Sequence, residues 1–92
     1  MIVSFRHRGL KRLFEHGDRR RVSALHVPKL ELILADLDAA DTIEHLRRPG
    51  YRLHKLKGNR ADQYAIDVSC NWRIVFRLSA GQVFDVDLVD YH

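Results

Sequence analysis

The chain has 92 residues, of which 46% are hydrophobic and 9% aromatic, a composition that fits a small globular domain and excludes a disordered tail. No apolar run approaches the roughly 18 residues that a membrane-spanning helix needs, and the first residues lack the apolar core and cleavage site of a secretory signal. The single cysteine, Cys70, cannot form an internal disulfide, which is typical of a reducing compartment. We therefore expect one domain over residues 1–92, in the cytoplasm and away from membranes.

Charge is distributed unevenly along the chain, whose formal net charge is +4. Residues 1–60 contain 14 of the 16 lysines and arginines but only 7 of the 12 acidic residues, a net charge of +7, whereas residues 61–92 have a net charge of −3. A basic portion of this kind favours a polyanionic partner, although a solvated basic surface explains the same counts.

The first half of the chain is predicted to be mainly helical. Ile2–Phe5 is rich in β-branched and aromatic residues, which predicts a short N-terminal strand. Apolar residues at helical spacing then predict one helix from about His7 to His16, followed by Gly17 as a C-terminal cap, and a second from Pro28 to about Ala40. A shorter turn is expected at 42–46.

From residue 51 onward the apolar period changes to two, which predicts strands. Four are expected, at Tyr51–Leu56, Tyr64–Ser69, Trp72–Leu78 and Val83–Val89. The resulting fold class is α+β, with two helices packed on one face of a mainly antiparallel sheet of about four to five strands. In the last two strands the residues expected to face the helices are Trp72, Ile74, Phe76, Leu78, Phe84, Val86 and Leu88.

Alternation also predicts how the strands pair. The residues of the last two strands that are expected to face the helices lie on the same face only if the residue numbers of each cross-strand pair sum to an even number. We therefore expect Arg77 opposite Asp85, with a three-residue loop at 80–82. This register places Arg73 on the uncovered face, opposite Asp67 in the preceding hairpin and diagonal to Tyr91.

The last three residues, Asp90-Tyr91-His92, extend the final strand. Strict alternation sends Asp90 and His92 to the side opposite Tyr91, so the three act together only if the chain departs there from regular strand geometry.

Side chains suited to cutting RNA gather near this end. Cleavage without a metal needs a base for the 2′-hydroxyl, an acid for the departing 5′-oxygen, and cations for the charge on the phosphorane. Histidine suits the first two roles and arginine the third, since its planar fork binds two phosphate oxygens. The candidate residues are His54, Lys57, Arg73, Asp90, Tyr91 and His92.

Each candidate also has a structural explanation. Arg73 can form an ion pair with Asp67 or Asp87, and His54 can be a half-buried polar residue of a strand. The last three residues can be a frayed tail. The other histidines lack metal-ligand spacing, so we expect neither a metal nor a cofactor.

The motifs together resemble the HigB-type toxins, the plasmid maintenance or proteic killer branch of the RelE/ParE superfamily. The resemblance runs through nearly the whole chain and is most specific in three places: L-x-x-L-K-G-x-R from residue 53 to 60, N-W-R-I from 71 to 74, and D-Y-H at 90–92. It also covers Ile2-Val3-Ser4-Phe5, Gly9-Leu10, Leu13-Phe14, Tyr64-Ala65-Ile66 and Val75-Phe76.

This resemblance implies a compact RelE-like domain with a curved sheet, and a ribosome-dependent endoribonuclease that cuts translated mRNA in the decoding site. It further implies inhibition by a HigA-like helix-turn-helix antitoxin, with operator DNA reached only through that antitoxin. By position, the six candidate residues match the family's catalytic or RNA-contacting residues. A basic helix and loop would hold ribosomal RNA phosphates through Arg8, Lys11, Arg12, Arg19, Arg20 and Arg21.

Two other functions remain open from the sequence. The superfamily also contains toxins that poison DNA gyrase on the same fold, and fold alone does not decide function. A gyrase poison has no use for a cluster of histidine, tyrosine and arginine. The other alternative is a catalytically inactive binding or regulatory protein.

Overall fold

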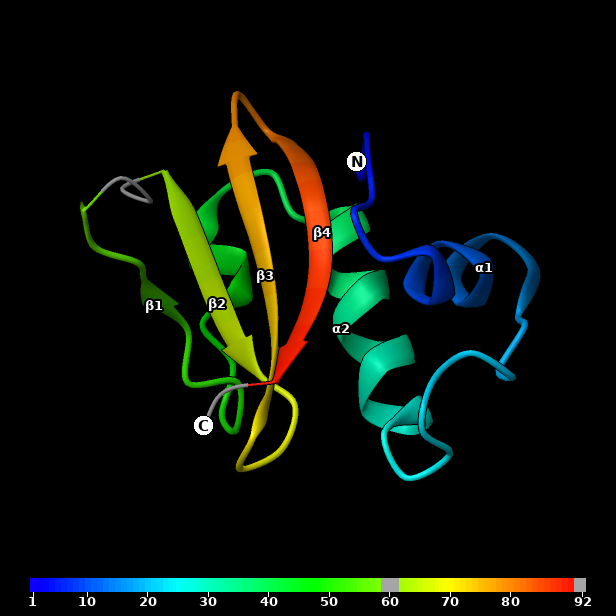
Figure 1. The fold of residues 1–92 in the computed structure, drawn as a ribbon. Coiled ribbons are helices and arrows are strands. Elements are labelled where there is room, and N and C mark those ends of the chain that lie inside the picture. The colour runs from blue at the N-terminus through cyan, green and yellow to red at the C-terminus, as the bar shows by residue number, and fades with distance from the viewer. Residues whose placement is uncertain (59–61, 91–92) are drawn as a thin grey trace.

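The computed structural model describes residues 1–58 and 62–90, so Tyr91 and His92 of the predicted site lie outside the described residues. None of the helices in the described part of the chain is long and apolar enough to cross a membrane. Helices and strands follow one another as α1 (Arg8–His16), α2 (Val27–Ala39), the 3-10 helix η1 (Ile43–Leu46), β1 (His54–Lys55), β2 (Gln63–Asp67), β3 (Trp72–Ser79) and β4 (Gln82–Asp90). The four strands form one antiparallel sheet in the order β1-β2-β3-β4 (Figure 1).

Both long helices begin and end where the sequence predicts. The side chain of His7 caps α1, since its Nδ1 accepts a hydrogen bond of 3.1 Å from the backbone N–H of Leu10. Gly17 ends α1 in the left-handed region, at φ 68°, where a side chain would be disfavoured. A proline in the first turn starts α2, and extended Ala40 ends it.

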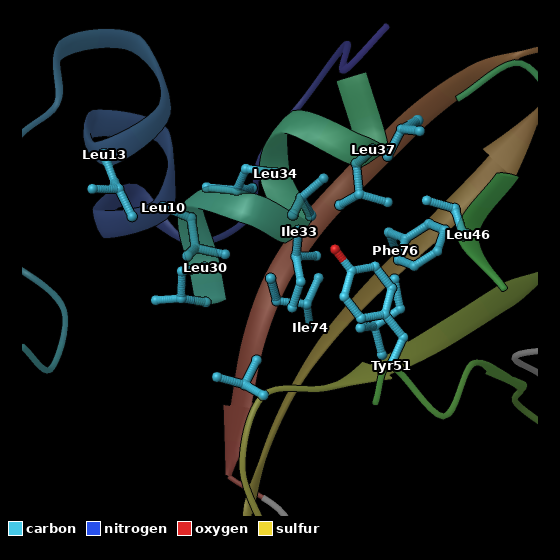
Figure 2. Packing of buried hydrophobic residues seen from close by; sticks show 14 of the residues in the cluster. Leu10, Leu13, Leu30, Ile33, Leu34, Leu37, Leu46, Tyr51, Ile74 and Phe76 are labelled. Carbon is cyan, nitrogen blue, oxygen red and sulfur yellow. The ribbon is translucent and has the colours of Figure 1, made fainter. Parts of the chain in front are cut away.

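The main core lies between the helices and one face of the sheet. Leu30, Ile33 and Leu37 point from α2 toward Ile74 and Phe76 of β3, and all five are no more than 1% exposed (Figure 2). These contacts confirm the predicted packing of two helices on the sheet. A smaller cluster of Leu56, Ala65 and Val75, with Val89 packed against it, forms separately from this core.

The predicted N-terminal strand is reduced to two isolated parallel bridges between residues 2–5 and β4. These bridges join Ile2 to Val83 and Phe5 to Val86. Between them the backbone N–H of Asp85 turns to the hydroxyl of Ser4, at 2.9 Å. Asp85 is a bulge residue with φ 57°, so it interrupts what would otherwise be a continuous parallel ladder.

The predicted strand 51–56 shrinks to the two residues of β1. Tyr51 is 3% exposed, and its hydroxyl donates a hydrogen bond to Asp36 of α2. Arg52 follows with φ 49°, a left-handed conformation that does not continue a regular strand. Tyr51 and Leu53 therefore pack against the main core, whereas Leu56 belongs to the smaller cluster, and the extended ladder begins only at His54.

The pairing of β3 with β4 is as predicted near the chain end but wrong near the turn. Arg73 pairs with Val89, whereas Arg77 pairs with Phe84 and Ser79 with Gln82, so the loop has two residues and not three. The bulge at Asp85 accounts for the change by adding one residue to β4. Consequently Val83 is the buried residue, and Phe84 lies on the other face under the Arg77 guanidinium, 5.0 Å from its ring centre.

Candidate active site on the open face of the sheet

The sheet face opposite the helices brings His54 and Arg73 together. Directly paired residues of an antiparallel ladder point to the same face. His54 pairs with Ala65, Ala65 pairs with Val75, and Asp67 pairs with Arg73. His54 and Arg73 therefore share this face, on β1 and β3. With strands about 4.8 Å apart and residues about 3.4 Å apart along a strand, their Cα atoms are separated by about 12 Å, a gap that two long side chains can close around a phosphate.

Arg73 is held by a carboxylate. Its Nε donates a 2.8 Å hydrogen bond to Oδ1 of Asp67, and the two side chains are 21% and 16% exposed. Asp67 also forms an ion pair with Arg52, whose Nε lies 3.4 Å from Oδ2. The ion pair expected as the structural explanation for Arg73 is thus present. It is made through Nε of Arg73.

The imidazole of His54 is exposed and oriented by the backbone. Its Nδ1 lies 2.9 Å from the carbonyl oxygen of Arg52. A carbonyl only accepts, so Nδ1 carries the proton of the neutral ring and Nε2 carries the lone pair. A histidine held in this tautomer is suited to take a proton at Nε2. Lys57 is exposed two residues after β1.

The structure does not bring Asp90 to the same face. Asp90 pairs with Trp72, whose side chain packs against the main core, so Asp90 lies on the helix side at the exposed end of β4. This is the side that strict alternation predicts. Within residues 1–58 and 62–90, no three histidine, cysteine, aspartate or glutamate side chains are grouped to hold a metal ion.

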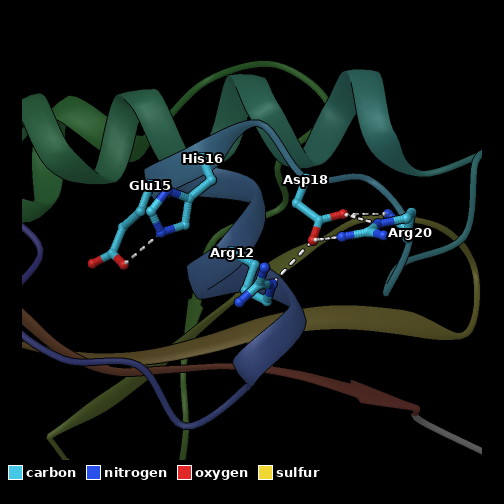
Figure 3. A network of polar contacts seen from close by, with 5 residues as sticks. All are labelled: Arg12, Glu15, His16, Asp18 and Arg20. Atoms are coloured by element: carbon cyan, nitrogen blue, oxygen red, sulfur yellow. Dashed lines mark hydrogen bonds and ion pairs between the residues drawn. The ribbon is translucent and has the colours of Figure 1, made fainter.

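The predicted basic residues lie on α1 and the loop that follows it. A pocket of about 330 Å³ opens there, lined by Arg8, Lys11, Arg12, Glu15, His16 and Arg21. Arg12 and Arg20 both bind Asp18, each at 3.0 Å (Figure 3). Arg19 lies 3.6 Å from Glu31. Among the described residues Arg8, Lys11 and Arg21 make no such ion pair, so they are the cations of this surface best placed for an external anion.

Asp18 organises the loop after α1. Hydrogen bonds from the Arg20 side chain and backbone and from Arg12 hold the pKa of its carboxyl well below the usual range. The sequence shows a run of charges here but not which carboxylate binds which guanidinium.

Two residues of the open face were not predicted as site residues. Asp67 was expected only as an ion-pair partner of Arg73, and Arg52 was not singled out. Register gave the position of Asp67, whereas nothing in the local sequence predicts the left-handed backbone at Arg52. The only signal for Arg52 is its position two residues before His54.

Comparisons with known proteins show the family and the fold of the chain. Residues 3–92 match the family model described as "RelE-like toxin of type II toxin-antitoxin system HigB". The chain is 42% identical to "Endoribonuclease HigB" of Proteus vulgaris over 92 residues, the full length of both. A solved "YoeB/ParE toxin from Agrobacterium tumefaciens" is similar in fold, with a TM-score of 0.57 at 17% identity, covering 99% of this chain and 96% of that one. The predicted resemblance is confirmed, and the chain belongs to the HigB family of RelE-like toxins of type II toxin–antitoxin systems.

Proposed function

We propose that this toxin is an endoribonuclease that cleaves mRNA on the translating ribosome, without a metal, by attack of a 2′-hydroxyl. The proposal is supported by family membership and by the name of the relative that is 42% identical over its full length. The observation that carries it is that His54 and Arg73 share the open face of the sheet, where His54 would accept a proton and Arg73 would bind a phosphate.

In the proposed reaction the 2′-oxygen attacks the neighbouring phosphorus and the bond from phosphorus to the 5′-oxygen breaks. The products are a 2′,3′-cyclic phosphate and a 5′-hydroxyl end. Arg73 stabilises the charge of the phosphorane, a role in which one well-placed donor contributes about 10²–10³ in rate. His54 acts through Nε2 as base or acid, and His92 takes the complementary role.

The remaining candidates have supporting roles in the proposal. Lys57 holds a phosphate as a point charge. Asp90 orients a histidine or positions the phosphate, and Tyr91 stacks on a base or joins proton transfer.

A type II toxin has an antitoxin partner, and we infer that the partner here is a HigA-like helix-turn-helix protein through which the complex reaches operator DNA. The second partner in the proposal is the ribosome. The basic surface on α1 supports this, because clustered cations bind RNA phosphates with little dependence on base sequence.

The test is Arg73→Ala, with growth and the 5′ ends of cellular mRNA measured after induction. We expect growth arrest to disappear and cleavage of mRNA in programmed ribosomes to fall by about 10²-fold or more. The control is Arg47→Ala, which removes an arginine paired at 3.0 Å with Glu44 in η1, away from the site. A folded Arg73→Ala protein that remains fully toxic would remove Arg73 from the mechanism.

The same experiment separates the alternatives. DNA damage with intact mRNA after induction of the wild-type chain would indicate a gyrase poison. Neither effect would indicate a protein without this activity. Cleavage of free RNA at the rate seen with ribosomes would contradict ribosome dependence.

A further inference from the structure

Arg52 has an unusual backbone conformation for its residue type. Its φ of 49° lies in the left-handed region, which glycine and asparagine adopt readily and other side chains rarely do. The residue before it fixes the chain there. The backbone N–H of Tyr51 donates to the carbonyl of Arg48 at 3.1 Å, and its carbonyl accepts from Asp67 at 2.8 Å. Its buried ring is also held by Asp36. A backbone conformation held this firmly at an exposed arginine suggests a functional use.

This conformation lets Arg52 contact both halves of the candidate site. Its carbonyl oxygen is the group that orients His54, at 2.9 Å. Its side chain, 81% exposed, reaches back to Oδ2 of Asp67 at 3.4 Å. The other oxygen of Asp67 holds Arg73 at 2.8 Å. The proposed base and the proposed phosphate ligand are thus connected through Arg52 and Asp67.

The charges of this arrangement favour an anionic ligand. Two guanidinium groups share one carboxylate, so the group of three carries a net charge of +1 on a face with an apolar floor of Ala65 and Val75. Asp67 reduces the repulsion between the two arginines and holds Arg73 by its Nε.

We propose that Arg52 and Asp67 belong to the RNA-cleaving site. Asp67 is a positioning residue that orients the guanidinium of Arg73. Arg52 positions His54 through its carbonyl and presents a second guanidinium to an RNA phosphate next to the one that is cut. This inference rests on the proposed ribonuclease function and adds to it two residues and a second phosphate subsite.

The role of Asp67 is tested with Asp67→Asn in single-turnover cleavage of labelled mRNA on programmed ribosomes. We expect the limiting rate to fall about tenfold while the concentration giving half the limiting rate stays unchanged, because orientation is lost but binding is not. In an Arg73→Ala background the same change should have no further effect, since Asp67 acts through Arg73. An unchanged rate, or an equal loss in both backgrounds, would overturn the assignment.

A second variant guards against a folding defect. Asp67→Glu keeps the carboxylate and lengthens the side chain by one methylene, so it should melt at the wild-type temperature and recover part of the lost rate. If Asp67→Asn unfolds, the cleavage rate of Asp67→Glu is the test. The longer side chain must displace the Arg73 guanidinium, so full wild-type activity would contradict a positioning role for Asp67.

The phosphate subsite is tested with Arg52→Asn, because asparagine tolerates the left-handed backbone and leaves the carbonyl contact to His54 in place. The concentration for half the limiting rate should rise, and the slope of log affinity against log salt should decrease by about 0.7, the value for one phosphate contact to a single strand. The matched control is Arg47→Asn, which removes the same charge elsewhere. Equal effects of the two variants would refute the subsite.

The outcomes also distinguish a failure of this inference from a failure of the proposed ribonuclease function. If the wild-type chain leaves mRNA intact in the same assay, the proposed function fails. If the wild-type chain cuts mRNA and both variants behave like Arg47→Asn, the function stands and only the assignment of Arg52 and Asp67 fails.

Discussion

Replacing Tyr51 with phenylalanine should destabilise the protein by a predictable amount. The substitution removes only the hydroxyl, which donates to Oδ2 of Asp36 from a side chain that is 3% exposed. The bond joins α2 to the segment that enters β1, so its loss weakens the link between the helices and the sheet.

The magnitude follows from the partners. A buried hydrogen bond to a charged acceptor contributes about 1.5–3 kcal/mol to the free energy of unfolding. Asp36 keeps Arg48, whose Nε lies 2.9 Å from the same oxygen, so its carboxylate is not left unpaired and the cost should fall at the lower end, about 1.5–2 kcal/mol. For a domain of this size the melting temperature should fall by about 10 °C.

The pKa of the Tyr51 phenol adds a second, pH-dependent expectation. Burial first, and then the hydrogen bond to Asp36, raise this pKa above its ordinary value of 10.0. The folded protein therefore holds the phenolic proton more tightly than the unfolded chain does. The associated stabilisation is complete below pH 10.0 and is lost as the pH rises through the higher folded value, so the difference between wild type and Tyr51→Phe should shrink in that range.

The assay is thermal and urea unfolding of both proteins from pH 7 to pH 11. The control is Tyr64→Phe, because the Tyr64 ring stacks on Phe76 at 5.9 Å but its hydroxyl makes no hydrogen bond within the described residues. Equal melting temperatures for wild type and Tyr51→Phe at pH 7 would refute the reasoning, as would an equal loss in Tyr64→Phe.

The remaining predictions concern the basic surface, its loop and the hairpin turn. Changing Arg8, Lys11 and Arg21 together to glutamate should weaken ribosome binding by at least about tenfold at low salt and flatten its salt dependence, measured by sedimentation. Asp18→Asn should lower the urea midpoint at pH 7. Because the pKa of Asp18 is lowered in the folded protein, the difference in urea midpoint between wild type and Asp18→Asn should shrink as the pH falls below 3.8, the ordinary pKa of the group. Ala80→Asn should raise stability by about 0.5–1 kcal/mol, seen as a higher melting temperature, since Ala80 has φ 51° in a two-residue turn that favours asparagine.

Each of these has an outcome that contradicts it. Ribosome binding of the triple variant that keeps the wild-type affinity and salt slope would exclude this surface as the RNA contact. If the urea midpoints of wild type and Asp18→Asn differ by the same amount down to pH 2, the ion pairs of Asp18 are not the cause of the difference in stability. A lower melting temperature for Ala80→Asn would show that the turn depends on something other than the backbone conformation of its first residue.

The sequence was most informative where alternation is unbroken. In β2 and β3 the polar residues all occupy odd-numbered positions, so the pairing of Ile66 with Ile74 and of Asp67 with Arg73 could be predicted. In β4 the run Val83-Phe84 offers two apolar residues in succession, and either can be the buried one. The bulge at Asp85 selects Val83, and it depends on contacts with the N-terminal segment and Arg77 that are remote in sequence.

The site was predictable to a similar extent. Register alone predicted Arg73 on the open face, and residue type on a neighbouring strand made His54 a candidate before the resemblance supported both. The contribution of Arg52 could not be predicted, because its left-handed backbone depends on the contacts of Tyr51 with a helix and with β2. Tertiary contacts here override the preference of a single residue, which sequence patterns do not record.

The bulge at Asp85 also determines which changes in chain length this strand pair can absorb. Between the bulge and the turn, the residue numbers of each β3–β4 pair sum to an odd number, as for Arg77 and Phe84. On the other side of the bulge they sum to an even number, as for Arg73 and Val89, because Asp85 is one extra residue in β4. Removing Asp85 would join the two halves into a regular ladder without moving any other described pair. One residue inserted or deleted in β4 between the bulge and Val89 would instead turn every following side chain, Asp90 included, to the opposite side of the sheet. The candidate site should therefore tolerate length variation at the hairpin turn and not beyond the bulge.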